Sequence, residues 1–114
     1  MSQAPAIPHY YNLEPTSVPD MPGYVEVECC YLFDWDAFES HHWQELESIY
    51  ACLPGYLGEG PFWFGVERDG PFLTASVEMV RLLQVYGTLR INDWQEWDAS
   101  FQALAVDLPT RLLD

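Results

Sequence analysis

Residues 24–33 follow a period of two, with alternating apolar and acidic residues in the first half and apolar residues on both sides near Cys30 and Leu32. Val25 and Val27 take one set of alternate positions, and Glu26 and Glu28 take the other. A period of two residues is typical of a strand with one buried side and one solvent-facing side. The pattern therefore predicts a strand whose glutamates lie on the open face of a sheet.

The apolar period then changes to three and four residues, which predicts a helix. Asp34 or Asp36 can cap its start, because a short carboxylate accepts hydrogen bonds from the first free N–H groups. Pro54 and Gly55 follow the last apolar position and are typical of a helix end. The stripe expected to face the core consists of Phe38, His42, Leu46, Ile49 and Leu53.

A hairpin is predicted between residues 62–68 and 72–78, because Asp69 and Gly70 both tolerate the positive φ of a tight turn. One register of these two strands would bury Phe62, Phe64, Val66, Leu73, Ala75 and Val77. The same register would direct outward Trp63, Glu67, Thr74, Ser76 and Glu78.

Residues 82–91 alternate as well, and we expect a strand there with Tyr86 outward. A short helix over residues 79–86 is the alternative. Asn92 then caps a second predicted helix, which Pro109 ends. The apolar stripe of this helix consists of Trp94, Trp97, Phe101, Leu104 and Leu108.

Together these elements predict an α+β two-layer sandwich in the order β-α-β-β-β-α. Its antiparallel sheet would have about four strands, with two helices on one face. Residues 23–114 form this single domain, which is long enough to bury a modest core. Residues 1–22 precede it as an extended arm, because proline disfavours helix; the prolines are Pro5, Pro8, Pro15, Pro19 and Pro22.

The charge balance is the unusual property of the composition. Eighteen acidic residues face four arginines and no lysine, so the formal net charge is −14. Such a chain repels nucleic acid and anionic lipid, since binding a phosphate backbone normally needs Lys and Arg. We therefore expect a basic protein as the partner, with no direct contact to nucleic acid or membrane. The alternative is that the acidity serves solubility alone.

The N-terminus and the cysteines predict a cytoplasmic, reduced location. No positively charged, apolar leader precedes Pro5 and Pro8, and no stretch approaches the roughly 20 apolar residues that span a bilayer. The three cysteines are an odd number and do not make a disulfide framework. Cys29 and Cys30 are adjacent in a strand and point to opposite sides, which indicates buried structural thiols.

No catalytic residue, metal site or cofactor is predicted. His41 and His42 have helical spacings to Glu45 and Glu39, but one helix supplies only two or three metal ligands. His9 is the only other histidine. We expect His42 to pack in the core stripe and His41 to be solvated.

The open face of the sheet is the predicted binding surface. Exposed aromatic rings surrounded by charge are typical of protein-binding sites. Two alternatives remain: the arm covers this face with Tyr10 and Tyr11 stacked on Trp63, or a homodimer buries it. The predicted partner-binding residues are Glu26, Glu28, Trp63, Glu67, Glu78 and Tyr86.

The predicted function is that of an acidic protein-binding module that inhibits or regulates a basic partner. In its most concrete form it is an immunity-type inhibitor of a bacterial toxin, such as a nuclease with a basic cleft, and opposite charge would speed association. One alternative is a DNA mimic that occupies a nucleic-acid-binding protein. The other is a small metal-dependent hydrolase that uses His41, His42 and Glu45.

Overall fold

The computed structural model of the chain describes residues 9–12, 16–65, 70–78 and 82–110, with side chains from residue 16 onward. This part contains six strands, two α-helices and one 3-10 turn. In chain order they are β1 (His9–Asn12), β2 (Thr16–Ser17), β3 (Tyr24–Leu32), η1 (Trp35–Ala37), α1 (Ser40–Cys52), β4 (Phe62–Trp63), β5 (Phe72–Glu78), β6 (Leu82–Arg90) and α2 (Ile91–Leu104).

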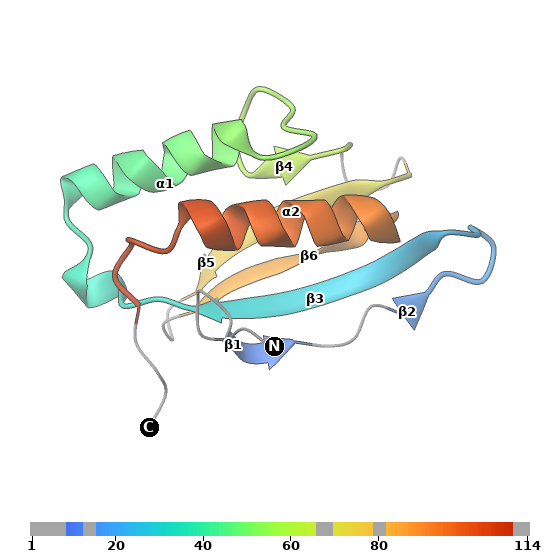
Figure 1. The fold of residues 1–114 in the computed structure, drawn as a ribbon, viewed down its shortest axis with the longest axis horizontal. Coiled ribbons are helices and arrows are strands. Elements are labelled where there is room, and N and C mark those ends of the chain that lie inside the picture. The colour runs from blue at the N-terminus through green and yellow to red at the C-terminus, as the bar shows by residue number, and fades with distance from the viewer. Residues whose placement is uncertain (1–8, 13–15, 66–69, 79–81, 111–114) are drawn as a thin grey trace.

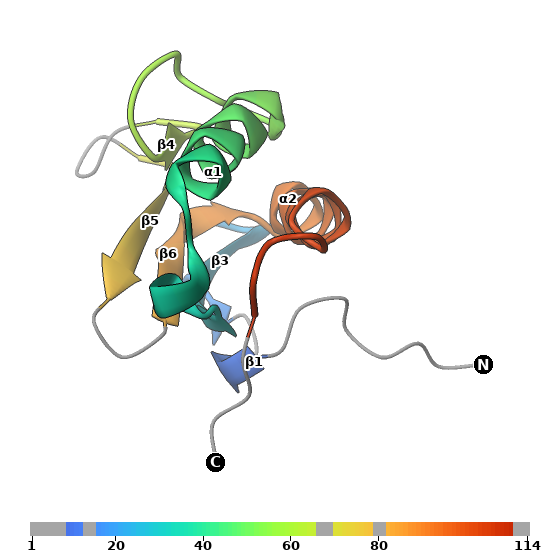
Figure 2. The same cartoon turned by 90° about the vertical axis from the view of Figure 1, so that its left-hand side faces the viewer.

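The strands form one antiparallel sheet in the order β1-β3-β6-β5-β4, and β2 also pairs with β3. Both helices lie on the same face of this sheet (Figures 1 and 2). The predicted two-layer α+β class and the order β-α-β-β-β-α from β3 onward are confirmed. The sheet has more strands than expected because β1 and β2, within the predicted arm, pair with the outer edge of β3.

Aromatic side chains fill the space between the sheet and the helices. Trp63 and Trp97 meet edge to face with ring centroids 5.1 Å apart, and Trp97 stacks on Phe101 at 5.2 Å. Such pairs contribute about 0.5–1.5 kcal/mol each beyond the area that they bury. The largest fully buried side chains are Trp63, Trp97, Tyr31, Phe33 and Phe101.

Helix α1 begins later than the sequence predicts. Asp34 and Asp36 do not cap it; Asp34 precedes the 3-10 turn, in which Trp35 donates from Nε1 to the Glu78 carbonyl oxygen at 2.9 Å. The turn ends at its C-cap, Phe38, whose extended backbone separates it from the helix. The N-cap of α1 is Glu39, which forms a reciprocal capping box with His42.

Helix α2 begins at Ile91 with Arg90 as its N-cap, so the prediction that Asn92 caps it is wrong. Its stripe is largely as expected, because Trp94, Trp97, Phe101 and Leu108 are buried. Leu104 is 45% exposed, however, and Ala105 is buried in its place. The helix ends at Leu104, and the turn that follows brings Leu108 back to the core.

The register predicted for the hairpin is wrong at its first strand. Trp63 is completely buried on the helix side of the sheet, whereas Phe62 is 37% exposed. Phe64 has φ 69°, which ends β4 after two residues, so the expected alternation does not continue at Phe64 and Gly65, and Val66 lies outside the described residues. The predicted turn at Asp69 lies outside the described residues.

Two residues of β5 also differ from the predicted pattern. Val77 is 47% exposed although it points to the helix side, because it lies near the end of the strand. Thr74 is buried on the opposite side, where its hydroxyl donates to the Pro61 carbonyl oxygen at 2.8 Å. The predicted strand over residues 82–91 is confirmed as β6, which ends at Arg90.

Candidate functional site

The sheet face that points away from the helices, here called the open face, brings together part of the predicted set. Glu26 and Glu28 lie on it, and Tyr86 of β6 is directly opposite Glu28. Glu26 is exposed, whereas Glu28 is half-buried and accepts a hydrogen bond from Gln84 Nε2 at 3.1 Å. Of the two glutamates predicted from the alternation of β3, Glu28 is therefore the one opposite an aromatic ring, and Glu26 is opposite Thr88.

Glu78 lies on the same face but at the far end of β5, opposite Leu82. Its carboxylate accepts a hydrogen bond from Ser76, which holds it against its own strand. Tyr86 is half-buried and meets Phe72 edge to face, with ring centroids 6.2 Å apart. The open face is thus built from separate pairs rather than from one compact acidic cluster.

Trp63 is not part of the open face. Its described ring partners are Tyr50, Tyr56 and Trp97, all on the helix side. The alternative prediction, in which the arm stacks on Trp63 across the open face, is therefore wrong as well. Glu67, the remaining predicted residue, lies outside the described residues.

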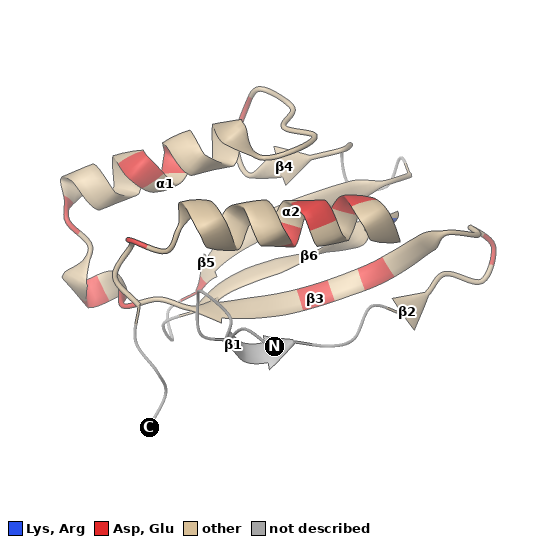
Figure 3. Cartoon of the chain, viewed as in Figure 1, with Lys and Arg blue, Asp and Glu red and all other residues tan. Residues whose placement is uncertain are grey.

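The acidic residues are spread over both layers (Figure 3). On the helix layer, which consists of α1 and α2, they include Glu45, Glu47, Asp93, Glu96 and Asp98. Arg90 is the only basic residue in the described part of the chain apart from the histidines, and its guanidinium lies over the Tyr24 ring at 5.3 Å. The carboxylates of the helix layer are a second candidate surface, which the alternation of the strands does not predict.

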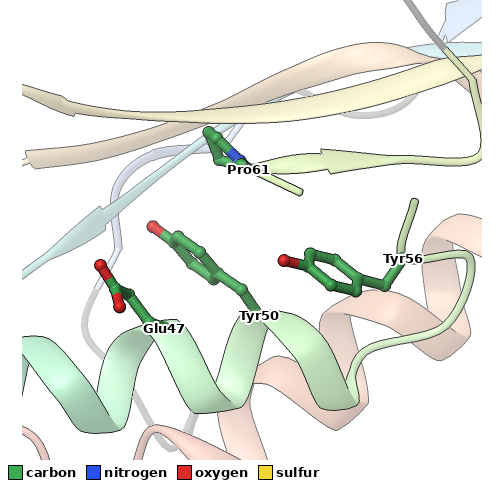
Figure 4. A pocket seen from close by; sticks show the side chains of 5 residues that line it. Glu47, Tyr50, Tyr56 and Pro61 are labelled. Carbon is green, nitrogen blue, oxygen red and sulfur yellow. The ribbon is translucent and has the colours of Figure 1, made fainter. Parts of the chain in front are cut away.

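A pocket of about 320 Å³ opens on the helix layer between α1 and the segment that leads into β4. Its lining consists of Glu47, Tyr50, Tyr56, Gly60 and Pro61. Figure 4 shows the two tyrosine rings side by side, with Glu47 next to Tyr50 on the helix and Pro61 on the opposite wall. The sequence contains one signal for this pocket: Glu47 and Tyr50 are three residues apart, which places both on one side of a helix.

Buried groups beneath the pocket hold its lining in place. Trp63 donates from Nε1 to the Tyr50 carbonyl oxygen at 3.1 Å, and its ring meets the Tyr50 ring edge to face. Burial raises the pKa of the Tyr50 hydroxyl, and the nearby Glu47 carboxylate raises it further. Tyr50 therefore stays protonated at neutral pH and can donate a hydrogen bond.

The thiols of Cys29 and Cys30 are buried, as the sequence predicts, whereas that of Cys52 is exposed. Burial raises the pKa of Cys29 from 9.0 to about 12. The pKa of its neighbour Tyr31 is also raised, first by burial and then by the charges of Cys29 and Asp98. Tyr31 donates to the Asp98 carboxylate, which also accepts from Gln102 Nε2 at 3.0 Å. A thiol that stays protonated is a poor nucleophile.

The raised pKa values predict a loss of stability at alkaline pH. The folded state keeps the protons of Cys29, Tyr31 and Tyr50 where the unfolded chain begins to lose them, at its ordinary pKa values of 9.0 and 10.0. Below about pH 8, these three groups should therefore not change the free energy of unfolding. At pH 10 they should lower it by about 2 kcal/mol. Urea denaturation at a series of pH values measures this.

A matched pair of cysteine variants identifies the source of that loss. Cys29→Ala should remove more than half of the alkaline decrease, whereas Cys52→Ala, at an exposed position, should keep all of it. An identical pH dependence in both variants would show that Cys29 does not carry the effect.

His41 and His42 lie at the start of α1, and His42 takes part in its cap. Glu39, His41 and His42 place one potential metal ligand each within 4.8 Å of one another. His42 Nδ1, however, accepts a hydrogen bond from the Glu39 backbone N–H at 2.9 Å, and the Glu39 carboxylate accepts from the backbone N–H of His42. The prediction that His42 packs in the core stripe is wrong, because it is half-buried at the cap.

Within the described residues, no helix has the length and apolar character needed to cross a membrane. Comparison of the chain with protein-family models, with curated proteins and with solved structures gives no match.

Proposed function

We propose that this chain is an acidic protein-binding module that inhibits or regulates a basic partner. The observation that carries the proposal is the charge: eighteen acidic residues against four arginines, with exposed carboxylates on both layers of the fold. In its most concrete form the module is an immunity-type inhibitor that occupies the basic cleft of a bacterial toxin, such as a nuclease.

The described carboxylates support this function because most are available to a partner. Glu26, Glu45, Glu47 and Glu96 are exposed, and no ion pair within the described part of the chain neutralises them. An approaching basic surface would be attracted by all of these charges and would associate faster at low ionic strength. Binding should therefore weaken steeply as salt increases.

The other two functions have less support. A DNA mimic needs carboxylates that follow one surface as phosphates do, but here they lie on the open face and on both helices. A metal-dependent hydrolase would need the His41 and His42 cluster, in which His42 Nδ1 already accepts a hydrogen bond from the backbone N–H of the N-cap residue Glu39. A protein partner needs neither arrangement.

The proposal predicts a basic partner whose binding depends on salt and on these carboxylates. The wild-type chain is used to capture partners from a lysate of its source at low and high salt, and the captured protein is identified by mass spectrometry. Two charge-reversed variants are compared: Glu26→Lys, Glu28→Lys, Glu78→Lys on the open face, and Glu45→Lys, Glu47→Lys, Glu96→Lys on the helix layer. One of them should weaken the purified partner's affinity at least about 100-fold.

The variant that loses affinity identifies the layer that binds, and the other variant is its control. The identified partner should also lose its own activity when the wild-type chain is added. The proposal is contradicted if no basic protein is enriched, or if binding is the same at both salt concentrations and in both variants.

A further inference from the structure

The pocket on the helix layer has the composition of a site for an organic cation. Its walls are the rings of Tyr50 and Tyr56, and Glu47 supplies a carboxylate at its rim. Aromatic faces attract cations through their quadrupole, and a carboxylate next to them adds a direct charge. Neither the two tyrosine hydroxyls nor the Glu47 carboxylate has a hydrogen-bond partner among the described residues.

The pocket is formed before any ligand binds. Tyr56 pairs with Trp63 as an isolated antiparallel bridge, and Leu57 N–H donates to the Phe62 carbonyl oxygen at 3.2 Å. Gly55 has φ +78° with the Phe64 ring against it, so only glycine permits this close approach. A preformed site loses little conformational freedom on binding, which raises the affinity that a few contacts can give.

The size of the pocket suits a small group such as one amino-acid side chain. Its volume of about 320 Å³ is at the lower end of the range for small-ligand sites.

The Pro61 carbonyl oxygen already accepts hydrogen bonds from Thr74 and from the Ala75 backbone N–H. The free acceptors are therefore the Glu47 carboxylate and the two tyrosine hydroxyl oxygens.

A guanidinium group fits these features better than an ammonium group. It is planar and stacks on aromatic rings, and its fork of N–H donors matches a carboxylate and neighbouring oxygens at once. We propose that this pocket receives an arginine side chain of the basic partner. The proposal rests on the proposed function, since it names the residue of that partner which the helix layer binds.

Single-residue probes test the pocket without the partner. N-acetyl-arginine methylamide, its lysine analogue and its neutral citrulline analogue are titrated separately into the ¹⁵N-labelled chain. The arginine probe should shift the amide signals of Tyr50 and Tyr56 and the Trp63 indole signal, with saturation in the millimolar range. The lysine probe should bind about fivefold more weakly, and the citrulline probe should produce no saturable shift.

Variants assign the binding to the lining residues. Glu47→Gln keeps the shape of an exposed side chain and should weaken the arginine probe at least about fivefold. Tyr56→Leu should do the same through loss of the aromatic wall. The matched control is Glu45→Gln, which removes an exposed charge from the same helix outside the pocket and should change the affinity less than twofold.

Three results would overturn the proposal: no saturable shift with the arginine probe, equal affinity for the arginine and lysine probes, or equal weakening by Glu47→Gln and Glu45→Gln. If these occur while a basic partner still binds through the charges, the proposed function stands and only the pocket is excluded. Saturable, variant-sensitive binding of the arginine probe supports the pocket even if no basic partner is captured, in which case only the proposed function fails.

Discussion

Replacing Trp63 by alanine is expected to lower the free energy of unfolding by about 4 kcal/mol. Trp63 is completely buried, and its ring contacts Tyr50, Tyr56 and Trp97. The substitution removes this packing and also leaves the Tyr50 carbonyl oxygen without the indole donor. Urea denaturation followed by far-ultraviolet circular dichroism measures the loss, since that signal comes mainly from the backbone.

The matched control for this prediction is Phe62→Ala in the same short strand. Phe62 is 37% exposed and lies on the opposite side of the sheet, so its loss should cost less than about 1 kcal/mol. If Trp63 points toward the helices, Trp63→Ala should lower the free energy of unfolding more than Phe62→Ala does. If Trp63 points toward the open face, the order should be reversed. A larger loss for Phe62→Ala than for Trp63→Ala would show that Trp63 points outward after all.

The elements with a clear period were predictable from the sequence. In β3 the acidic residues Glu26 and Glu28 mark one side so strongly that only one orientation buries Val25 and Val27. In α2 the large rings of the stripe fix the buried face in the same way. Hydropathy predicts which side of a strand or helix is buried where polar and apolar residues occupy different sides of it.

The orientation of Trp63 was not predictable on this basis. Phe62, Trp63 and Phe64 are three aromatic residues in a row, so both registers bury aromatic area and hydropathy does not choose between them. The choice comes from distant contacts. The Tyr50 carbonyl oxygen accepts the Trp63 N–H, and Gly55 accommodates the Phe64 ring where φ becomes positive.

The start of α1 was missed for a similar reason. Asp34 and Asp36 are both good capping residues, and local preference favours a helix beginning there. The structure instead uses Glu39, and Trp35 in the preceding 3-10 turn is bonded to the Glu78 carbonyl oxygen on β5. A bond between residues 43 positions apart in the chain cannot be read from a local pattern.

Of the two candidate sites, one was predictable from the sequence and the other was not. The glutamates of the open face follow from the alternation of β3, and the structure places Glu26 and Glu28 there. The pocket of the helix layer does not follow from any one element. Glu47 and Tyr50 come from α1, whereas Tyr56 and Pro61 come from the loop after it. Only the path of that loop brings the second ring beside the first.

Gly87→Ala is expected to destabilise the chain by about 3 kcal/mol, because the centre of the sheet has no space for a Cβ atom at this position. A Cβ atom there would lie 2.1 Å from the Phe72 carbonyl oxygen and 2.8 Å from the Leu73 Cα atom. Both are backbone atoms of β5, so the collision cannot be relieved by a side-chain rotation. β5 would have to move away from β6, which weakens the pairing of Leu73 with Gly87.

The control for Gly87→Ala is Thr88→Ala at the next residue of the same strand. Thr88 is half-buried on the open face, and its replacement changes strand propensity by less than about 1 kcal/mol. Amide hydrogen exchange gives a second measure, since Gly87→Ala should lower protection in β5 and β6 while leaving the pairing of β3 with β2 protected. Equal stability of the two variants would mean that β5 does not approach Gly87 so closely, and the β5–β6 register would then be wrong.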